Sequence, residues 1–274
     1  MFDKIIYLTQ SACSIGYTAG FAIFSLEIRW YALSYIIGLL LGQKYITYIL
    51  KKDIINDKIQ HKLIENFLLW AIIGILIGGR IGYIIFYNIN YYINNFIEIF
   101  YLWEGGMSFH GGLIGILISI VIFSKKYNLN FFSITDLVAS AAPIGIFFGR
   151  VSNFLNGELW GRPADLPWSI RFTKCAGDIY RHPSQLYEAF LEGIVLFFIL
   201  YFCAIKLKYI NTPGKITGIF CIFYSSFRIF SEFFREPDYQ IGFIFLNFTM
   251  GMILSIPLFL IGIILIIKNK KERS

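Results

Sequence analysis

The sequence predicts an all-α integral membrane protein with seven transmembrane helices, built as a single polytopic domain over residues 1–274. Hydrophobic residues make up 57% of the chain and charged residues only 15%, whereas soluble domains carry about a quarter charged residues. Several apolar runs approach the roughly 20 residues that a helix needs to cross a bilayer. The 29 phenylalanines and 18 tyrosines also suit lipid-facing and interfacial positions.

Seven apolar segments form the expected spans, and polar or basic loops separate them. The third and fourth segments are short, and the last contains Pro257, which can kink a helix. The largest loop, at about 157–185, is expected outside the cytoplasm, and its two tryptophans suit a membrane interface. The expected spans are 30–50, 64–86, 109–124, 133–150, 186–205, 216–234 and 241–267.

The distribution of basic residues predicts the orientation. Of the 24 lysines and arginines, 13 lie in one alternating set of loops, 7 in the other set and 4 within the spans. Because cytoplasmic loops are enriched in Lys and Arg, the first set is assigned to the cytoplasm. The N-terminus is then expected outside and the C-terminus in the cytoplasm. This asymmetry explains the net charge of +7 without a nucleic-acid partner.

Polar side chains gather at the outer ends of five expected spans. Ionisable groups at membrane depth are costly, so they are rare and usually functional. Arg150 and Asn153 have an i, i+3 spacing, and Arg228 and Glu232 have an i, i+4 spacing, so each pair shares a helix face. The alternative for Arg228 and Glu232 is a buried ion pair that only orients helices. The converging residues are Tyr31, Arg80, His110, Arg150, Asn153, Arg228, Glu232 and Arg235.

Two of these residues lie beside glycines. His110 precedes two glycines, and histidine has the pKa range for general-base work. Its alternative role is a ring bonded to a backbone carbonyl at a helix start. Arg80 follows two glycines and is a candidate for anion binding, although small residues there are also explained by tight helix packing. No cluster of His, Cys, Asp or Glu has metal-ligand spacing, and the sequence has no phosphate-binding P-loop.

The four cysteines show no metal-type or paired spacing. Cys203 and Cys221 lie in apolar runs and are expected to be inert small hydrophobes. Cys13 and Cys175 could meet outside the membrane, but nothing in the sequence requires it. His182 directly precedes a proline and is expected in a loop or at a helix start.

From the residues alone, two function classes other than an enzyme stay open. An anion transporter or channel would place polar groups at the membrane midplane or through both leaflets, whereas here they crowd one leaflet. A membrane scaffold would not need a histidine and several arginines at one depth.

Several motifs, in this order and in these places on the spans, resemble the bacterial prolipoprotein diacylglyceryl transferase family. The most specific is residues 149–162, Gly-Arg-Val-Ser-Asn-Phe-Leu-Asn-Gly-Glu-Leu-Trp-Gly-Arg. Ser152 departs from the family pattern, in which many members have glycine. The supporting motifs are residues 29–31, 78–83, 109–112, 182–188 and 233–238, so the resemblance covers nearly the whole chain.

The resemblance implies a multi-pass enzyme of the bacterial inner membrane that needs no metal or organic cofactor. It implies transfer of the diacylglyceryl group of phosphatidylglycerol to the lipobox cysteine thiol of a preprolipoprotein signal peptide. A thioether would form and glycerol phosphate would leave, as the first step of lipoprotein maturation. The active site would face the extracytoplasmic leaflet, where the arginines converge.

The resemblance also implies roles for matching residues. Arg150 and Arg228 are expected to bind phosphate, because arginines stabilise developing phosphate charge best in a low-dielectric site, and Glu232 would orient Arg228. A base or a positive environment should assist thiol deprotonation, so His110 as base or headgroup ligand competes with arginine-assisted thiolate formation. The expected catalytic residues are His110, Arg150, Arg228 and Glu232; the expected substrate-binding residues are Tyr31, Arg80, Asn153, Glu158 and Arg235, of which Arg80 comes from the residue pattern alone.

Overall fold

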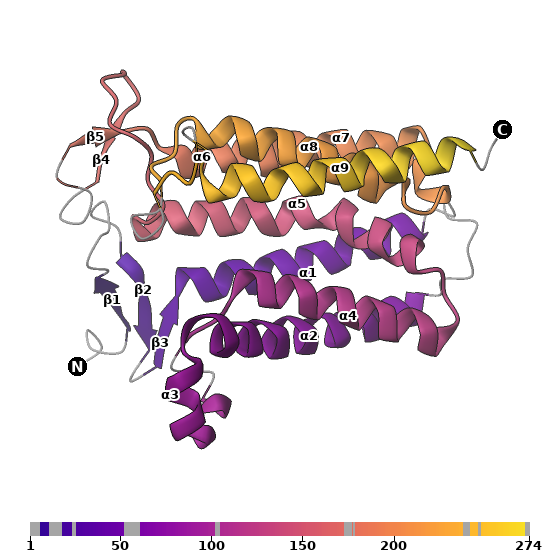
Figure 1. Ribbon diagram of the computed structural model, residues 1–274, viewed down its shortest axis with the longest axis horizontal. Coiled ribbons are helices and arrows are strands. Elements are labelled where there is room, and N and C mark those ends of the chain that lie inside the picture. Colours follow the sequence, from indigo (N-terminus) through magenta and orange to yellow (C-terminus); the bar gives the residue numbers. More distant parts are fainter. Residues whose placement is uncertain are drawn as a thin grey trace. The chain divides into compact units, whose positions relative to one another are not determined.

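The computed structural model describes residues 6–10, 18–23, 26–51, 61–101, 105–172, 177, 179–237, 242–245 and 248–271. Within these residues the protein is mainly helical (Figure 1). Each long helix follows an apolar run, because a segment in lipid must satisfy its backbone hydrogen bonds internally. The long helices are α1 (Trp30–Lys51), α2 (His61–Tyr87), α4 (Phe109–Tyr127), α5 (Phe131–Asn156), α8 (Lys215–Glu232) and α9 (Met250–Lys271).

One further helical segment, Ser184–Lys206, changes its winding along its length. One π-helical stretch separates its two α-helical parts, and a second ends the segment. π-Helical turns are rare overall, and those that occur are often found at functional sites. The first π-helical turn contains Glu192. The parts in order are α6 (Ser184–Glu188), the π-helical η4 (Ala189–Val195), α7 (Leu196–Tyr201) and the π-helical η5 (Phe202–Lys206).

Six of the described helices are long and apolar enough to cross a membrane. They correspond to six of the seven expected spans, namely α1, α2, α4, α5, the Ser184–Lys206 segment and α9. In the described part of the chain, α8 does not join them, because its 18 residues carry Lys215, Arg228 and Glu232. Charged side chains in lipid need partners, and α8 as the seventh span stays a prediction.

Two helix ends differ most from the expected spans. Helix α5 continues to Asn156, beyond the expected end at residue 150, so Arg150 and Asn153 lie one turn apart on one helix. Helix α9 begins at Met250, and the described residues from 242 to 249 are not helical, so the expected start near residue 241 is wrong. The hydroxyl of Thr249 accepts a hydrogen bond from the N–H of Met252 and thereby caps the first turn of α9. Residue 241 itself lies outside the described residues.

Short strands and helices also occupy segments outside the expected spans, so the all-α prediction is incomplete. Three N-terminal strands form an antiparallel sheet in the order β1-β2-β3, in which Tyr7 pairs with Ala22 and Phe21 with Ile28. A second antiparallel pair, β4 and β5, lies in the large loop after α5. The elements are β1 (Ile6–Gln10), β2 (Thr18–Ile23), β3 (Leu26–Arg29), β4 (Ile170–Arg171), β5 (Tyr180–Arg181), α3 (Ile89–Asn94), the 3-10 helix η2 (Phe96–Phe100) and the 3-10 helix η6 (Tyr209–Asn211).

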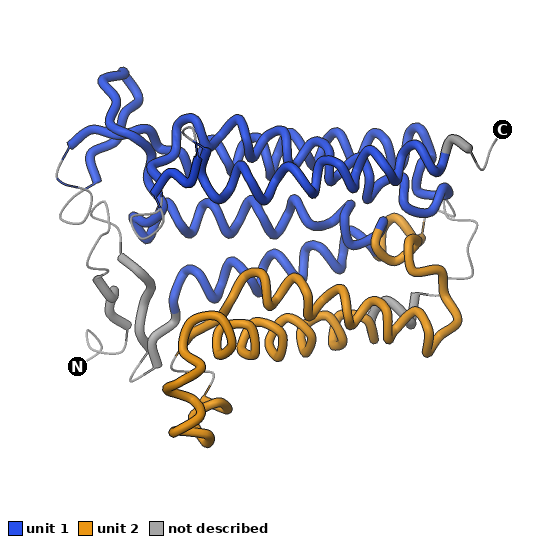
Figure 2. Tube along the Cα trace, in the orientation of Figure 1, with its two compact units in different colours: residues 1–46, 136–274 blue, residues 47–135 orange. Residues whose placement is uncertain are grey.

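The chain divides into two compact units, unit 1 with Met1–Ile46 and Asp136–Ser274, and unit 2 with Thr47–Thr135 (Figure 2). Within unit 2, α2 packs closely on α4. A methyl group at Gly78 would lie only 2.7 Å from the Cα of Gly115. Small residues allow helix backbones to approach this closely, so the packing explanation of the glycines beside Arg80 is confirmed.

Within unit 1, Asp136 joins α5 to the start of α8. Its side chain is fully buried and accepts hydrogen bonds from the N–H of Gly214 (2.8 Å), the N–H of Thr217 (2.7 Å) and the hydroxyl of Thr217 (2.5 Å). The first N–H groups of a helix have no partner within the helix, so a carboxylate from α5 caps α8. From this end, α8 packs along α9 and contacts α7.

Candidate active site

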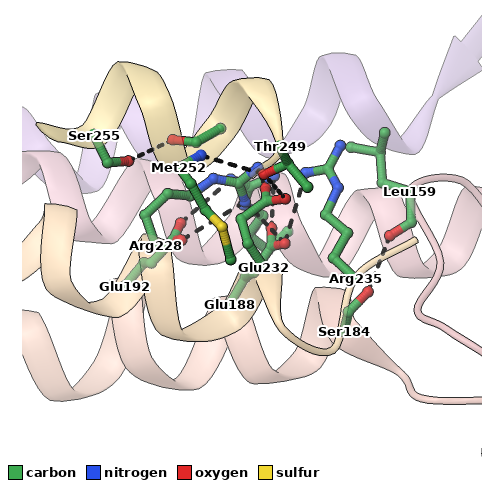
Figure 3. Close-up of polar contacts among 12 residues, drawn as sticks. Leu159, Ser184, Glu188, Glu192, Arg228, Glu232, Arg235, Thr249, Met252 and Ser255 are labelled. Atoms are coloured by element: carbon green, nitrogen blue, oxygen red, sulfur yellow. Dashed lines mark hydrogen bonds and ion pairs between the residues drawn. The ribbon is translucent and has the colours of Figure 1, made fainter. Parts of the chain in front are cut away.

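Three arginines and three glutamates form a buried group in unit 1, which we call the arginine–glutamate cluster. Figure 3 shows Arg228, Arg235 and the glutamates of this cluster. The side chains come from α5, the Ser184–Lys206 segment, α8 and the chain that follows α8. The carboxylate side chains are 0–4% exposed and the arginine side chains 8–17% exposed. The formal charges of the six residues cancel. The members are Arg150, Glu188, Glu192, Arg228, Glu232 and Arg235.

Glu188 is at the centre of this cluster. Its Oε2 lies 2.8 Å from Nη1 of Arg150. Its Oε1 lies 2.9 Å from Nη1 of Arg228 and 3.6 Å from Nη1 of Arg235. An unpaired charge in a dry interior is costly, and Glu188 meets this requirement with guanidinium groups from three parts of the chain.

Glu232 contacts the second terminal nitrogen of Arg228. Its Oε1 forms an ion pair with Nη2 of Arg228, four residues earlier on α8, and its Oε2 accepts a 2.8 Å hydrogen bond from the hydroxyl of Thr249. A methyl group at Gly251 would lie 2.5 Å from Oε1 of Glu232, so the first turn of α9 can approach this closely only with glycine there. The pair expected from the i, i+4 spacing is therefore present and buried.

Glu192 has longer contacts than the other two carboxylates. Its Oε2 lies 3.3 Å from Nη2 of Arg150, and its Oε1 lies 3.9 Å from Nη1 of Arg228. Its side chain is completely buried in the π-helical turn η4. Because Glu192 follows Glu188 by four residues, both carboxylates face the same two arginines.

A hydrogen-bond network holds the residues that follow α5. The side-chain amide of Asn153 donates to Oε1 of Glu158 (2.8 Å), and the side-chain amide of Gln185 donates to the carbonyl of Glu158 (2.6 Å). The hydroxyl of Ser184 donates to the carbonyl of Leu159 (3.1 Å). Leu159 has a φ of 58°, which is uncommon for a residue with a side chain. These bonds attach two expected site residues, Asn153 and Glu158, to the first turn of α6.

The large loop is attached to the end of α8 by Arg162. The N–H of Arg162 donates to the carbonyl of Phe234 (2.8 Å), and Nε of Arg162 donates to the carbonyl of Arg235 (3.0 Å). Gly161 and Arg235 also form an isolated β-bridge. Residues 160–162 of the signature and residues 234–236 therefore lie side by side, and this arrangement directs the Arg235 side chain toward Glu188 (Figure 3).

His182 lies directly before Pro183, the N-cap of α6, as expected for a loop or helix-start residue. Its Nδ1 lies 3.2 Å from the hydroxyl of Tyr187, and this hydroxyl also accepts a 2.8 Å hydrogen bond from the indole N–H of Trp168. Partial burial lowers the pKa of the His182 imidazole below its usual value. These contacts explain His182 as a packing residue of the loop.

Tyr31 is in the first turn of α1 and is 37% exposed. Its hydroxyl accepts a 2.9 Å hydrogen bond from the hydroxyl of Tyr35, and the two rings meet edge to face with centroids 4.8 Å apart. Tyr31 belongs to unit 1, as do Asn153, Glu158 and the arginine–glutamate cluster. Its exposed position leaves the ring accessible to a ligand.

Arg80 belongs to unit 2 and is only 3% exposed. Its Nε donates to the carbonyl of Ile99 (2.9 Å), Nη1 to that of Gly105 (2.5 Å) and Nη2 to that of Glu98 (2.6 Å). The guanidinium group also lies 5.1 Å from the centroid of the Tyr92 ring. These contacts hold the segment around η2 against α2. The expected contact of Arg80 with an anion stays a prediction.

His110 also belongs to unit 2 and is exposed in the first turn of α4. The helix begins here because the hydroxyl of Ser108 accepts a 3.3 Å hydrogen bond from the N–H of Gly111. The imidazole touches the Phe109 ring, with centroids 5.6 Å apart, and no described residue forms a hydrogen bond with it. A bond to a nearby backbone carbonyl, the alternative role, is therefore absent from the described part of the chain.

Sequence reasoning missed Glu188 and Glu192. The available signal was two acidic residues four positions apart at the start of an otherwise apolar run. Buried acids in a membrane helix need cationic partners, and a helix puts residues four apart on one face. The signal does not identify the partners, because Arg150 and Arg228 are distant in sequence.

Among the described residues, no group of three or more His, Cys, Asp or Glu is placed to hold a metal ion. Cys203 and Cys221 are free thiols, Cys203 partly and Cys221 fully buried. Cys13 and Cys175 lie outside the described residues.

The family model and the similar proteins that match this chain all name the same family. The family model described as prolipoprotein diacylglyceryl transferase matches residues 19–268. A phosphatidylglycerol–prolipoprotein diacylglyceryl transferase from Rickettsia bellii (strain OSU 85-389) is 51% identical over 250 residues, which cover 91% of this chain and 94% of the relative. The proteins with this name from Rickettsia felis and Agrobacterium fabrum are 48% and 47% identical, over 92% and 87% of this chain and 96% and 86% of the relatives.

Proposed function

This chain belongs to the prolipoprotein diacylglyceryl transferase family, and we propose its reaction and the use of its site from that membership. It is a diacylglyceryl transferase with several membrane-spanning helices. It transfers the diacylglyceryl group of phosphatidylglycerol to the lipobox cysteine thiol of a preprolipoprotein. The products are a thioether-linked lipid and glycerol phosphate, and the reaction is the first step of lipoprotein lipidation.

The arginine–glutamate cluster is the observation that supports a site for this reaction in the protein. The lipid substrate has one phosphodiester, and its phosphate gains negative charge when the bond to the diacylglyceryl carbon breaks. Guanidinium groups recognise phosphate with a planar set of donors. They are most effective when held in position before the reaction, in a site of low dielectric constant. The three carboxylates of the cluster supply that fixed position.

Within the cluster, Arg150 and Arg228 are proposed as the phosphate ligands. Arg150 is the most exposed of the three arginines, at 17%, and Arg228 follows at 11%. Glu232 orients Arg228 through their ion pair, and Thr249 orients Glu232. Each guanidinium group has five N–H donors, so contacts with glutamate leave donors for a phosphate oxygen.

The remaining expected residues receive roles in the same reaction. Asn153 and Glu158 bind headgroup hydroxyls or shape the site through their mutual hydrogen bond. Tyr31 and Arg235 contact the lipid substrate, and Arg80 is retained as a substrate-binding residue. His110 is retained as a base or headgroup ligand, because its exposed imidazole has no hydrogen-bond partner among the described residues.

The membrane arrangement is part of the proposal. The chain forms one polytopic domain in the bacterial inner membrane, with α8 as the seventh span. The N-terminus lies outside, the C-terminus lies in the cytoplasm, and the active site opens toward the extracytoplasmic leaflet. The basic residues support this orientation, because 13 lie in one set of loops and 7 in the other.

The experiment that tests the function uses purified protein in vesicles that contain phosphatidylglycerol. A synthetic lipobox peptide is added, and mass spectrometry measures thioether-linked diacylglyceryl peptide. Product should form only with phosphatidylglycerol and only with a cysteine peptide. Vesicles of phosphatidylethanolamine alone and a peptide with cysteine replaced by serine are the controls. Absence of product with the cysteine peptide would contradict the proposed reaction.

A further inference from the structure

One oxygen in the arginine–glutamate cluster lies farther from a cationic or hydroxyl donor than the others. Oε1 of Glu192 and both carboxylate oxygens of Glu188 are buried and accept no hydrogen bond from any described residue. Each oxygen of Glu188 nevertheless has a guanidinium nitrogen within 2.9 Å, and Oε1 of Glu192 does not. Nη1 of Arg228 lies 3.9 Å from it, too far for a hydrogen bond. The other oxygen, Oε2, lies 3.3 Å from Nη2 of Arg150. Among the described residues, Oε1 of Glu192 is therefore the carboxylate oxygen of the cluster with the weakest contacts.

The other two carboxylates are held more firmly. Glu188 has guanidinium nitrogens at 2.8 Å and 2.9 Å, one on each oxygen. Glu232 pairs with Arg228 on one oxygen and accepts the hydroxyl of Thr249 on the other. Protonating either residue would remove the negative charge that holds a guanidinium group in close contact. The guanidinium nitrogens nearest to Glu192 lie at 3.3 Å and 3.9 Å, so protonating Glu192 at Oε1 loses less Coulomb attraction.

Charge balance indicates a role for Oε1 of Glu192 in the proposed reaction. The cluster holds three positive and three negative side chains, so it is neutral before substrate binds. The phosphodiester brings one negative charge. When the cysteine sulfur displaces the phosphate, the leaving glycerol phosphate gains a second negative charge. The proton of the thiol must move to a group in the site. If a cluster carboxylate takes that proton, one negative charge disappears from the site as another appears on phosphate.

We propose that Glu192 accepts the thiol proton in this transfer, an inference that rests on the proposed function. The sulfur–carbon bond forms as the carbon–oxygen bond to phosphate breaks, and the electron pair of that bond stays on the phosphate oxygen. The thiol proton moves to Oε1 of Glu192. Arg150 and Arg228 then balance the phosphate with fewer carboxylates competing for their donors.

The surroundings of Glu192 suit a group that changes charge. Arg150 faces it from α5, Glu188 lies one turn earlier, and Arg228 faces it from α8. Tyr224, one turn before Arg228 on α8, lies within electrostatic reach of the same charges. The backbone at Glu192 is a π-helical turn, a form that is frequent at functional sites.

The test compares two lipobox peptides that differ only in the nucleophile, cysteine or selenocysteine, on vesicles of phosphatidylglycerol. A selenol is ionised at neutral pH, so its attack needs no proton acceptor. Glu192→Gln keeps the size of the side chain and removes the acceptor. We expect its rate to fall roughly 10²–10⁴-fold with cysteine, as on loss of a general base, but less than about tenfold with selenocysteine.

Glu188→Gln is the matched control, because it removes the same charge from the same cluster. It should lower both rates by the same factor. If Glu192→Gln also lowers both rates equally, Glu192 has only a structural role and the inference is overturned. Wild-type protein that modifies neither peptide would instead overturn the proposed function.

If Glu192→Gln fails to insert into the membrane, His110→Asn still tests which residue accepts the thiol proton, with the same two peptides. A selenocysteine rate restored to wild type, beside a low cysteine rate, would make His110 the proton acceptor and overturn the inference. An unchanged ratio of selenocysteine to cysteine rates in His110→Asn supports Glu192.

Discussion

Arg150 on α5 and Arg228 on α8 bind the two oxygens of one carboxylate. Nη1 of Arg150 lies 2.8 Å from Oε2 of Glu188, and Nη1 of Arg228 lies 2.9 Å from Oε1. The width of a carboxylate therefore sets the separation of these two guanidinium groups. A phosphate would meet two planar donor groups whose positions are fixed beforehand, and such preorganisation avoids rearrangement during the reaction.

The first prediction concerns the donor geometry of Arg150. Lysine keeps the charge but loses the planar fork, in which two separate nitrogens of Arg150 contact Glu188 and Glu192 and further donors are left for a phosphate. We expect Arg150→Lys to be strongly impaired and Arg150→Ala to lose on the order of 10²–10³ in rate, as for removal of a preorganised donor. The measurement is thioether formation at saturating phosphatidylglycerol, alongside membrane yield.

Arg171→Lys is the control, because Arg171 is exposed on β4. It should retain the wild-type rate. A well-expressed Arg150→Ala protein with normal rate would show that Arg150 is structural, and the phosphate role would pass to Arg228 or Arg80.

The second prediction separates the two roles of His110. The imidazole is exposed and has no hydrogen-bond partner among the described residues, so His110→Asn should not disturb folding. If His110 holds the headgroup, the variant should need more phosphatidylglycerol for half-maximal rate while its maximal rate changes little. If it is the base, the maximal rate should fall roughly 10²–10⁴-fold. Normal values for both constants would remove His110 from the mechanism.

The third prediction uses the close approach of α9 to the cluster. A methyl group at Gly251 would lie 2.5 Å from Oε1 of Glu232, so Gly251→Ala must displace the carboxylate that orients Arg228. We expect a large fall in thioether formation with the protein still inserted in the membrane. Gly145→Ala on α5 is the matched control, since a methyl group there meets no atom within 4 Å. Equal activity of the two variants would show that Glu232 does not orient Arg228 for the reaction.

The fourth prediction concerns stability. Asp136→Ala leaves the N–H groups of Gly214, which is buried, and Thr217, which is partly buried, without their acceptor. Such a loss costs about 1–3 kcal/mol, so the apparent melting temperature in detergent should fall by several degrees. Asp165→Ala, a change at an exposed loop residue, should leave the melting temperature unchanged. An unaltered melting temperature for Asp136→Ala would mean that α8 does not depend on this cap.

The fifth prediction concerns topology. A reporter fused after residue 274 should be active only in the cytoplasm, and a cysteine introduced at Asp165 should react with an impermeant thiol reagent from outside. The physical reason is the excess of basic residues in the loops assigned to the cytoplasm. A periplasmic signal from the fusion would reverse the orientation and move the proposed site to the other leaflet.

The positions of the helices could be predicted because they depend on local properties. A helix in lipid needs a long apolar run, and α1, α2, α4 and α5 begin close to where such runs begin. The pairing of Arg228 with Glu232 could be predicted for the same reason, because four residues are about one turn of one helix. The start of α9 could not, since the apolar run before Met250 does not show where the helix is capped.

By itself, the sequence determined a helical membrane protein and predicted charged residues near one membrane face, because run length and residue spacing act within single helices. Only the tertiary structure decided which charges meet. Arg150 on α5 pairs with Glu188 and Glu192, which lie on the Ser184–Lys206 segment. Arg80 is bound by backbone carbonyls, which no sequence pattern identifies. The physical reason is that a buried charge must be paired, but its partner is set by how helices pack, and packing depends on contacts between residues far apart in the chain.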